Sequence, residues 1–331
     1  MCVIFLIFGH PKYKLVVAAN RDEFVDRPAR RARFWDSAPH LIAGVDLGQA
    51  RALTDFRNAE EGIFPSSSDI LNSSIPTTQI VETAGEERSG TWVGMTTDGR
   101  LGFLTNYHNQ ELSLKLDAKT RGHLVRDYLV ATPQPDTSEY VNAVHKGRCH
   151  YNGFNLVIGN FLHDDVWYVG MGGLHGRNVE KLEKDVCYGV SNGDMRCHEG
   201  GWWRVHLGRS RFRQAISESN SRHELVETLL RMLKDKTPAI DAGEYLRPQV
   251  GICVDREMSP RKNYGTRTHT VIVVENNGDC TFLEEDRYML KMGADEDGGP
   301  NIEHGAWRNY FEFKVDLDGD GGGGGSSSRH S

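Results

Sequence analysis

The sequence predicts an α+β protein whose strands and helices pack in layers. Runs of β-branched and apolar residues dominate the first part of the chain, helical periodicity appears in the middle, and strand-like runs return towards the end. Strands, then helices, then strands again are typical of layered α+β architectures. The chain contains no long internal repeat, P-loop or dinucleotide-binding fingerprint.

The first two strands are expected to form a hairpin. Val3–Phe8 and Lys14–Ala19 are apolar and β-branched, and Gly9-His10-Pro11-Lys12 between them is a turn signal. Asp98-Gly99 marks another turn, between two later strands. These further strands are expected at Leu41–Val45, Thr91–Met95 and Leu101–Thr105.

Helices and strands alternate in the rest of the chain. Asp136-Thr137 can cap the second of four segments with helical periodicity. The helices are expected at Arg121–Val130, Ser138–His145, Ser210–Ser217 and Arg222–Asp235. The strands are expected at Phe154–Ile158, Val166–Gly170, Val186–Ser191, Gly251–Val254, Thr268–Val274 and Cys280–Leu283.

Two segments differ in composition from the predicted domain, which spans residues 1–315. Residues 49–88 are rich in Ser, Thr, Asn, Glu and Gly, and we interpret them as a surface insertion. Residues 316–331 are a low-complexity Gly/Ser-rich tail, which is expected to be disordered.

Charge and hydropathy exclude several classes of function. A formal charge of -7 argues against a nucleic-acid binder, which needs a basic face. Residues 27–33 and 204–213 are locally basic, and we interpret both as solvated faces, with a dock for an anionic ligand as the alternative. The apolar opening MCVIFLIFG is too short to span a membrane and lacks the basic start of a signal peptide. A cytoplasmic protein without a transmembrane segment is therefore expected.

The 6 cysteines lie far apart and include no CxxC pair. Reduced thiols and no metal site are therefore expected. Cys149-His150 and Cys197-His198 are adjacent pairs, and neighbouring strand residues point to opposite faces. We therefore interpret both pairs as incidental, with haem or metal ligation as the alternative.

Cys2 is the residue that points to chemistry. Initiator Met is normally removed before a small residue, which would leave Cys2 as the first residue. A free N-terminal cysteine carries a thiol and an α-amine, and the amine can act as the base for its own thiol. Many chains that begin Met-Cys are nevertheless inert.

The predicted hairpin brings polar residues next to Cys2. If the turn takes four to six residues, Cys2 lies opposite a residue between Ala19 and Arg21. Arg21 could then lower the pKa of the thiol and orient an anionic group, and Asp22 or Glu23 could hold the α-ammonium. An ordinary charged turn is the alternative for the run Asn20-Arg21-Asp22-Glu23.

Cys2 followed by VVAANRDEFVDRP at Val16–Pro28 resembles the signature of the NRDE family, the Transport and Golgi organization protein 2 group. Further stretches agree with it in order. These are Phe34-Trp35, Ile42–Gly44 with Asp46, Gly90–Gly94, Leu104–Asn106, Arg121-Gly122, Tyr151–Gly159, Tyr188–Gly193 and Tyr264–Thr270.

The resemblance implies the fold of the N-terminal-nucleophile hydrolases, an αββα sandwich of two antiparallel sheets between helical layers. The most similar enzymes are the bile-salt hydrolases and penicillin V acylases, whose catalytic arginine and aspartate Arg21 and Asp22 would match. Asn192 resembles their oxyanion donor, and Arg211 resembles their later arginine. Here Arg21 and Asp22 are adjacent, whereas those enzymes space the two residues as Arg-x-x-Asp.

Three further polar or aromatic residues are candidates for the pocket or the core. Asn106 ends a predicted strand, as Asn20 does, and the sequence supports a structural role and a pocket role equally. Asn155 lies within a strand and is expected to be a hydrogen-bonded structural residue. Trp92 is expected in the core or at the pocket rim.

By resemblance, the favoured function is a carrier with a role in Golgi organisation, protein secretion and the trafficking of haem or an acyl lipid. The alternative is an amidohydrolase that cleaves an amide or thioester with Cys2. No cofactor is required in either case, and haem is a candidate only as a transported ligand. The resemblance also implies association with the Golgi or mitochondria, and it identifies no protein partner.

Overall fold

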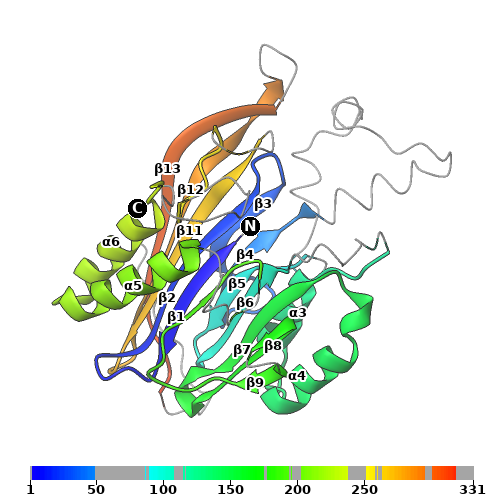
Figure 1. The fold of residues 1–331 in the computed structure, drawn as a ribbon, viewed down its shortest axis with the longest axis vertical. Helices are drawn as coiled ribbons and strands as arrows, with labels where there is room; N and C mark the ends of the chain where they lie inside the picture. The colour runs from blue at the N-terminus through cyan, green and yellow to red at the C-terminus, as the bar shows by residue number, and fades with distance from the viewer. Residues whose placement is uncertain are drawn as a thin grey trace.

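Two antiparallel sheets face each other in the structure, which is a computed structural model (Figure 1). It describes residues 2–48, 86, 89–107, 115, 117–174, 177–193, 195, 203–237, 251–257, 259, 263–294 and 300–317. The predicted tail lies almost entirely outside these residues. So does the predicted insertion at residues 49–88, apart from Glu86.

The first sheet contains the N-terminal hairpin and has six strands in the order β10-β1-β2-β11-β12-β13. All of its neighbouring strands are antiparallel. Its strands are β1 (Val3–Phe8), β2 (Tyr13–Phe24), β10 (Tyr188–Val190), β11 (Tyr264–Glu275), β12 (Asp279–Ala294) and β13 (Pro300–Lys314). The middle position of β1 and β2 explains why their sequences are apolar on both faces.

The second sheet is an antiparallel meander of seven strands, β3 to β9 in sequence order. Its strands are β3 (Ala29–Phe34), β4 (Leu41–Asp46), β5 (Val93–Thr96), β6 (Arg100–Asn106), β7 (Phe154–Asn160), β8 (Asp165–Leu174) and β9 (Arg177–Lys181). Each strand therefore lies beside its neighbour in the chain, as short connections favour.

Helices cover the outer face of each sheet. The helices α5 (Trp203–Glu218) and α6 (Arg222–Leu233) pack on the first sheet, and α3 (Gly122–Val130) and α4 (Thr137–Lys146) pack on the second. Asp136 caps α4, as predicted, by accepting a hydrogen bond from the backbone N–H of Glu139. The described residues also contain the single 3-10 turns η4 (Arg148–His150) and η5 (Phe161–His163). The four layers confirm the predicted αββα sandwich.

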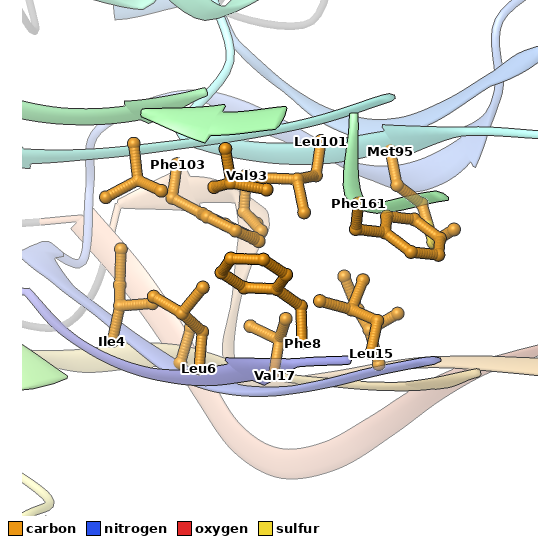
Figure 2. Close-up of a cluster of buried hydrophobic side chains, with 14 of the residues drawn as sticks. Ile4, Leu6, Phe8, Leu15, Val17, Val93, Met95, Leu101, Phe103 and Phe161 are labelled. Atoms are coloured by element: carbon orange, nitrogen blue, oxygen red, sulfur yellow. The ribbon is translucent and has the colours of Figure 1, made fainter. Parts of the chain in front are cut away.

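The main core lies between the two sheets (Figure 2). Ile4, Leu6 and Phe8 of β1 point into this core, while the alternate residues Val3 and Phe5 point to the helices. This alternation follows from the two-residue repeat of a strand. Consequently β1 is buried on both faces. Within β1, and likewise within β2, successive residues face different layers.

Several elements differ from the sequence prediction. Residues 27–33 were interpreted as a solvated basic face, yet β3 runs through them and Ala32 is fully buried. The three arginines of β3 interrupt the apolar alternation by which a strand is predicted from sequence. The strand predicted at Gly251–Val254 is instead an irregular segment, which packs on the first sheet through hydrogen bonds to Thr266. The strands β9 and β13 were not predicted, because their polar sequences resemble loops.

No helix among the described residues is long and apolar enough to cross a membrane.

We expect Phe8→Ala to lower the free energy of unfolding by about 3–5 kcal/mol, because Phe8 is fully buried between the sheets and its loss leaves a cavity. Phe24→Ala is the matched control. Phe24 is 42% exposed and only its edge-to-face contact with Tyr264 is lost, which is worth about 0.5–1.5 kcal/mol. Urea unfolding monitored by circular dichroism measures both, and equal losses in the two variants would contradict the assigned core.

Candidate functional site

Cys2 lies at the start of β1, between β2 and β10. Continuing the β1–β2 register by one pair places Cys2 opposite Arg21, which lies within the predicted range of Ala19 to Arg21. Continuing the β1–β10 register by two pairs places Cys2 opposite Asn192. The hydroxyl of Ser191 donates a hydrogen bond of 2.7 Å to the carbonyl oxygen of Cys2. The structure thus brings together three residues that lie far apart in the sequence.

Asn192 is a fully buried amide with unused hydrogen-bonding groups. Its exposed fraction is 0%, and neither Nδ2 nor Oδ1 has a hydrogen-bond partner within the described part of the chain. Leaving a buried amide without partners costs about 1–3 kcal/mol, so most buried amides are hydrogen-bonded. The side chain beside Cys2 is therefore available to bind an oxygen atom of a ligand.

Asn155 holds the backbone on both sides of Asn192. Its Nδ2 donates to the carbonyl oxygens of Ser191 and Gly193, at 3.0 Å each. The hydroxyl of Tyr168 donates to Asn155 Oδ1 at 2.6 Å, so the amide orientation is defined. The prediction of a hydrogen-bonded structural role for Asn155 is confirmed, and its hydrogen bonds tie the end of β10 to the second sheet.

Arg21 points into the space between the sheets. Its guanidinium carbon lies 4.3 Å from the centroid of the Trp92 ring, and its Nη2 donates to Asp46 Oδ2 at 3.0 Å. The side chain is only 3% exposed, yet its Nη1 has no partner among the residues that the structure describes. Trp92 therefore packs against a predicted site residue, and Arg21 retains one N–H group for a ligand.

Asp46 holds two arginine side chains, Arg21 and Arg27, beside the Cys2 strand. It accepts hydrogen bonds from Arg21 and from Arg27 Nε, the latter at 3.0 Å. Burial by itself would raise the pKa of Asp46, but Arg27 and Arg21 outweigh it and lower the pKa to about 2. Glu23 lies 3.9 Å from Arg27 Nε and belongs to the same ionic cluster.

Asp22 points away from this cluster, because adjacent residues of a strand face opposite sides. Its carboxylate accepts from Arg204 Nη1 at 2.6 Å and from the hydroxyl of Thr266 at 2.6 Å. The backbone oxygen of Asp22 lies 4.0 Å from Cys2 Sγ. Arg204, which was interpreted as part of a solvated face, is 1% exposed on α5 and holds Asp22 between the sheet and the helices.

Asn20 lies on the helical side of the sheet with Asp22. Its Nδ2 donates to the carbonyl oxygens of Leu233 and Ile252, at 2.9 Å each. Its Oδ1 accepts a 2.6 Å hydrogen bond from His269 Nδ1, which fixes the tautomer of the ring. Asn20 therefore joins the sheet to the end of α6 and does not contact the Cys2 thiol.

Two other predicted site residues lie outside the cluster. Arg211 is 39% exposed on α5 and pairs with Asp235 at the end of α6. The buried arginine that contacts the NRDE run from this helix is Arg204. Asn106 ends β6, half-buried and paired with Phe154 in the strand register.

Arg121 and Arg267 complete the cluster, although the sequence analysis assigned a role to neither. Burial and the charge of Arg27 lower the pKa of Arg121, while Glu23, Cys2 and Asp46 raise it. Burial and the charge of Arg21 lower the pKa of Arg267 to about 10. Both residues lie in stretches that agree with the family signature, Arg121-Gly122 and Tyr264–Thr270. A bulge of β11 between Thr266 and Thr268 places Arg267.

The environment of Cys2 keeps its thiol protonated. Burial raises the pKa of Cys2, the carboxylate of Asp22 raises it further, and Arg21 lowers it. The half-buried thiol therefore needs a base before it can act as a nucleophile.

The family comparison agrees with the motifs. The family model described as "Transport and Golgi organisation 2" matches residues 1–54 and 72–289. The Transport and Golgi organization protein 2 homolog of Bos taurus is 32% identical over 308 residues, which cover 88% of this chain and 94% of that protein. The Homo sapiens homolog is 30% identical over 302 residues, which cover 86% of this chain and 92% of that protein. The predicted family is confirmed.

The chain is also similar to two solved hydrolase structures. Penicillin V acylase from Agrobacterium tumefaciens matches with a TM-score of 0.41 and 12% identity, over 91% of this chain and 84% of that chain. A Caenorhabditis elegans ortholog of N-acylethanolamine-hydrolyzing acid amidase matches with a TM-score of 0.39 and 10% identity, over 82% and 92%.

We expect Asp46→Asn to lower the free energy of unfolding by about 2 kcal/mol at pH 7, because the pKa of Asp46 is lower in the folded chain. A lowered folded pKa stabilises the fold above the unfolded pKa, and this contribution disappears as pH falls through about 2. The difference between wild type and variant should therefore be about half as large at pH 3 and vanish near pH 2.

Urea unfolding from pH 7 to pH 2 measures this difference. Asp36→Asn is the matched control, because Asp36 pairs with Arg33 but its side chain is 84% exposed, and surface pairs contribute little. A difference for Asp46→Asn that stays constant between pH 7 and pH 3 would show that the ion pairs do not set the pKa of this carboxyl group.

Proposed function

The chain belongs to the Transport and Golgi organisation 2 family, and from that premise and the geometry around Cys2 we propose that it cleaves an amide or thioester bond of a small acyl compound. The observation that carries this proposal is the buried amide of Asn192 opposite Cys2, which has no hydrogen-bond partner among the described residues. A nucleophile beside a preformed donor for a carbonyl oxygen is the arrangement that acyl transfer requires.

The proposed reaction begins after removal of Met1. Cys2 Sγ attacks the carbonyl carbon, and the thiol proton passes to the free α-amine of Cys2. The oxygen of the resulting tetrahedral intermediate gains negative charge and accepts a hydrogen bond from Asn192 Nδ2. When the intermediate collapses, the α-ammonium gives its proton to the departing amine or thiol. The acyl group remains on Cys2 as a thioester.

Water completes the cycle. The α-amine takes a proton from a water molecule, whose oxygen attacks the Cys2 thioester. Collapse of the second intermediate releases the acid and restores the thiol. The α-amine is the base in both halves of the reaction. A base is required because burial raises the pKa of the Cys2 thiol.

Asn155 and Ser191 are positioning residues in this proposal. Asn155 fixes the carbonyl groups on both sides of Asn192, and Ser191 ties the same segment to the backbone of Cys2. Nucleophile and oxyanion donor are thus held on two adjacent strands. Such preorganisation is a large part of what enzymes contribute to acyl transfer.

The relatives of this chain are named for transport and Golgi organization. We propose that this chain takes part in the same cellular process, in the cytoplasm and in association with the Golgi or mitochondria. In this view the acyl compound belongs to the lipid supply of the secretory membranes. Protein secretion is then affected through the membrane rather than through a bound protein partner.

A carrier is the second candidate, and the protonated state of the Cys2 thiol favours it. A thiol whose pKa is raised by burial is a poor nucleophile unless the α-amine is free. The chain would then hold an acyl lipid or haem for transfer. An acyl lipid needs no ionised Cys2, whereas Cys2 would be a soft ligand for haem only after losing its proton, because the thiolate is the form that binds a metal.

The hydrolase proposal predicts that intact mass finds Met1 removed and that Cys2→Ala abolishes turnover of acyl amide and thioester probes. Asn192→Ala should lower kcat by about 100–1000-fold, because it removes an oxyanion donor. Asn142→Ala is the matched control and should keep wild-type activity, since Asn142 is exposed on α4. Retained Met1 with full turnover would exclude the α-amine mechanism.

A haem titration separates the carrier from the hydrolase. The hydrolase proposal predicts no stoichiometric haem binding that depends on Cys2. A one-to-one titration with a spectral change that Cys2→Ala abolishes would favour the carrier instead, above all if no acyl probe is turned over.

A further inference from the structure

Positive charge exceeds negative charge in the ionic cluster beside Cys2. Arg21 and Arg27 share Asp46, and Glu23 lies near Arg27. Arg121 and Arg267 interact electrostatically with the same two carboxylates, and Arg267 interacts with Asp286 as well. The cluster therefore sets four guanidinium groups against Asp46 and Glu23. Arg21 and Arg267 are buried, and an unbalanced buried charge is costly unless a counterion binds.

The buried arginines also have hydrogen bonds left to give. Arg21 Nη1 and Arg267 Nε are buried without an acceptor in the portion of the chain that the structure covers. Arg21 and Arg267 are 4% and 7% exposed, so water does not solvate them freely. Arg267 is held in place by its Nη1, which donates to the carbonyl oxygen of Arg27. A guanidinium offers donors only, so what these groups lack is an acceptor.

Two further carboxyl groups nearby do not supply the missing charge. Asp286 already accepts from Arg31 and from the hydroxyl of Thr268. Burial and the charge of Asp286 raise the pKa of Glu284, so this side chain tends to stay neutral. The surplus of positive charge at the site persists after both are considered.

We propose that Arg21, Arg121 and Arg267 bind an anionic group of the ligand, a carboxylate or a phosphate, beside Cys2. Guanidinium groups match the oxygen atoms of both anions and form strong charge-assisted hydrogen bonds with them. The Trp92 ring and Asp46 hold the Arg21 guanidinium from two sides, which leaves Nη1 for the ligand. The chain therefore recognises an acidic compound although its net charge is -7.

The position of Arg21 limits where the anion lies on the ligand. Cys2 and Arg21 occupy opposite positions in the continued β1–β2 register, where Cβ atoms are about 5 Å apart. The anionic group thus lies within a few bonds of the atom that meets Cys2 Sγ. This inference rests on the proposed function only in taking Cys2 as the reacting group.

Two alkylating reagents test the site without any turnover. Iodoacetate and iodoacetamide modify thiols by the same reaction, and only iodoacetate carries a carboxylate. We expect the ratio of their rates at Cys2, measured by peptide mass spectrometry, to favour iodoacetate by about tenfold relative to Cys2 of the urea-unfolded chain. The preference should decrease with added salt. A folded-state ratio equal to or below that of the unfolded chain would overturn the proposal.

Arginine variants test which residues bind the anion. Arg121→Gln and Arg267→Gln should each lower the iodoacetate preference by roughly threefold or more. Arg126→Gln is the matched control, because Arg126 lies on α3 and pairs with Asp127 outside the cluster. Circular dichroism and an unchanged iodoacetamide rate establish that each variant is folded. A wild-type ratio in both Arg121→Gln and Arg267→Gln would refute the assignment to these residues.

Competition distinguishes carboxylate from phosphate. Sodium acetate and inorganic phosphate are compared with sodium chloride at matched ionic strength, and the anion that slows iodoacetate modification at the lower concentration identifies the preferred group. If neither anion slows iodoacetate modification more than chloride does, the arginines create only a general positive potential without a binding site, and the proposal fails. A protein that prefers iodoacetate but hydrolyses no acyl probe would keep this anion site and lose the hydrolase function.

Discussion

The antiparallel pairing of β1 with β2 on one side and β10 on the other positions the residues that lie opposite Cys2. It places Arg21 and Asn192 opposite Cys2, although the three residues are separated widely in the chain. The pairing is itself secured on both faces of β1. Phe8 and its neighbours pack against the second sheet, and Phe5 packs against Phe212 of α5. A slip of one residue would turn these apolar side chains to the wrong layers, so core packing also defines the site.

The NRDE run serves two layers at once because it lies in a strand. Asn20 and Asp22 face the helices, where they bind the end of α6 and Arg204 of α5. Arg21 and Glu23 face the second sheet and the ionic cluster. Substitutions within this one motif should therefore have two kinds of effect. Changes at the first pair weaken the attachment of the helices, and changes at the second pair alter the chemistry beside Cys2.

Burial without full pairing occurs at several described residues, and at Asn192 and Arg21 it coincides with a position opposite Cys2. Both side chains are buried and retain polar groups with no partner in the described residues. In a low-dielectric interior such groups interact strongly with whatever ligand satisfies them. Asn192 and Arg21 have complementary roles, since an amide can donate a hydrogen bond to a carbonyl oxygen and a guanidinium can pair with an anion.

The sequence by itself determined the family and the αββα architecture through the resemblance of its motifs, and its local pattern determined the N-terminal hairpin, with Cys2 opposite a residue between Ala19 and Arg21. The hairpin was predictable because apolar alternation and turn residues act over short distances along the chain. Cys2, Arg21 and Asn192 followed from motifs, and the structure brings them together. Only the tertiary structure decided that Arg204, rather than Arg211, contacts the NRDE run, and that Asp22 faces away from the thiol. It also decided that Arg121 and Arg267 join the cluster. Those outcomes depend on which face of each strand meets which layer, and on a bulge in β11, and these are consequences of long-range packing that no local pattern encodes.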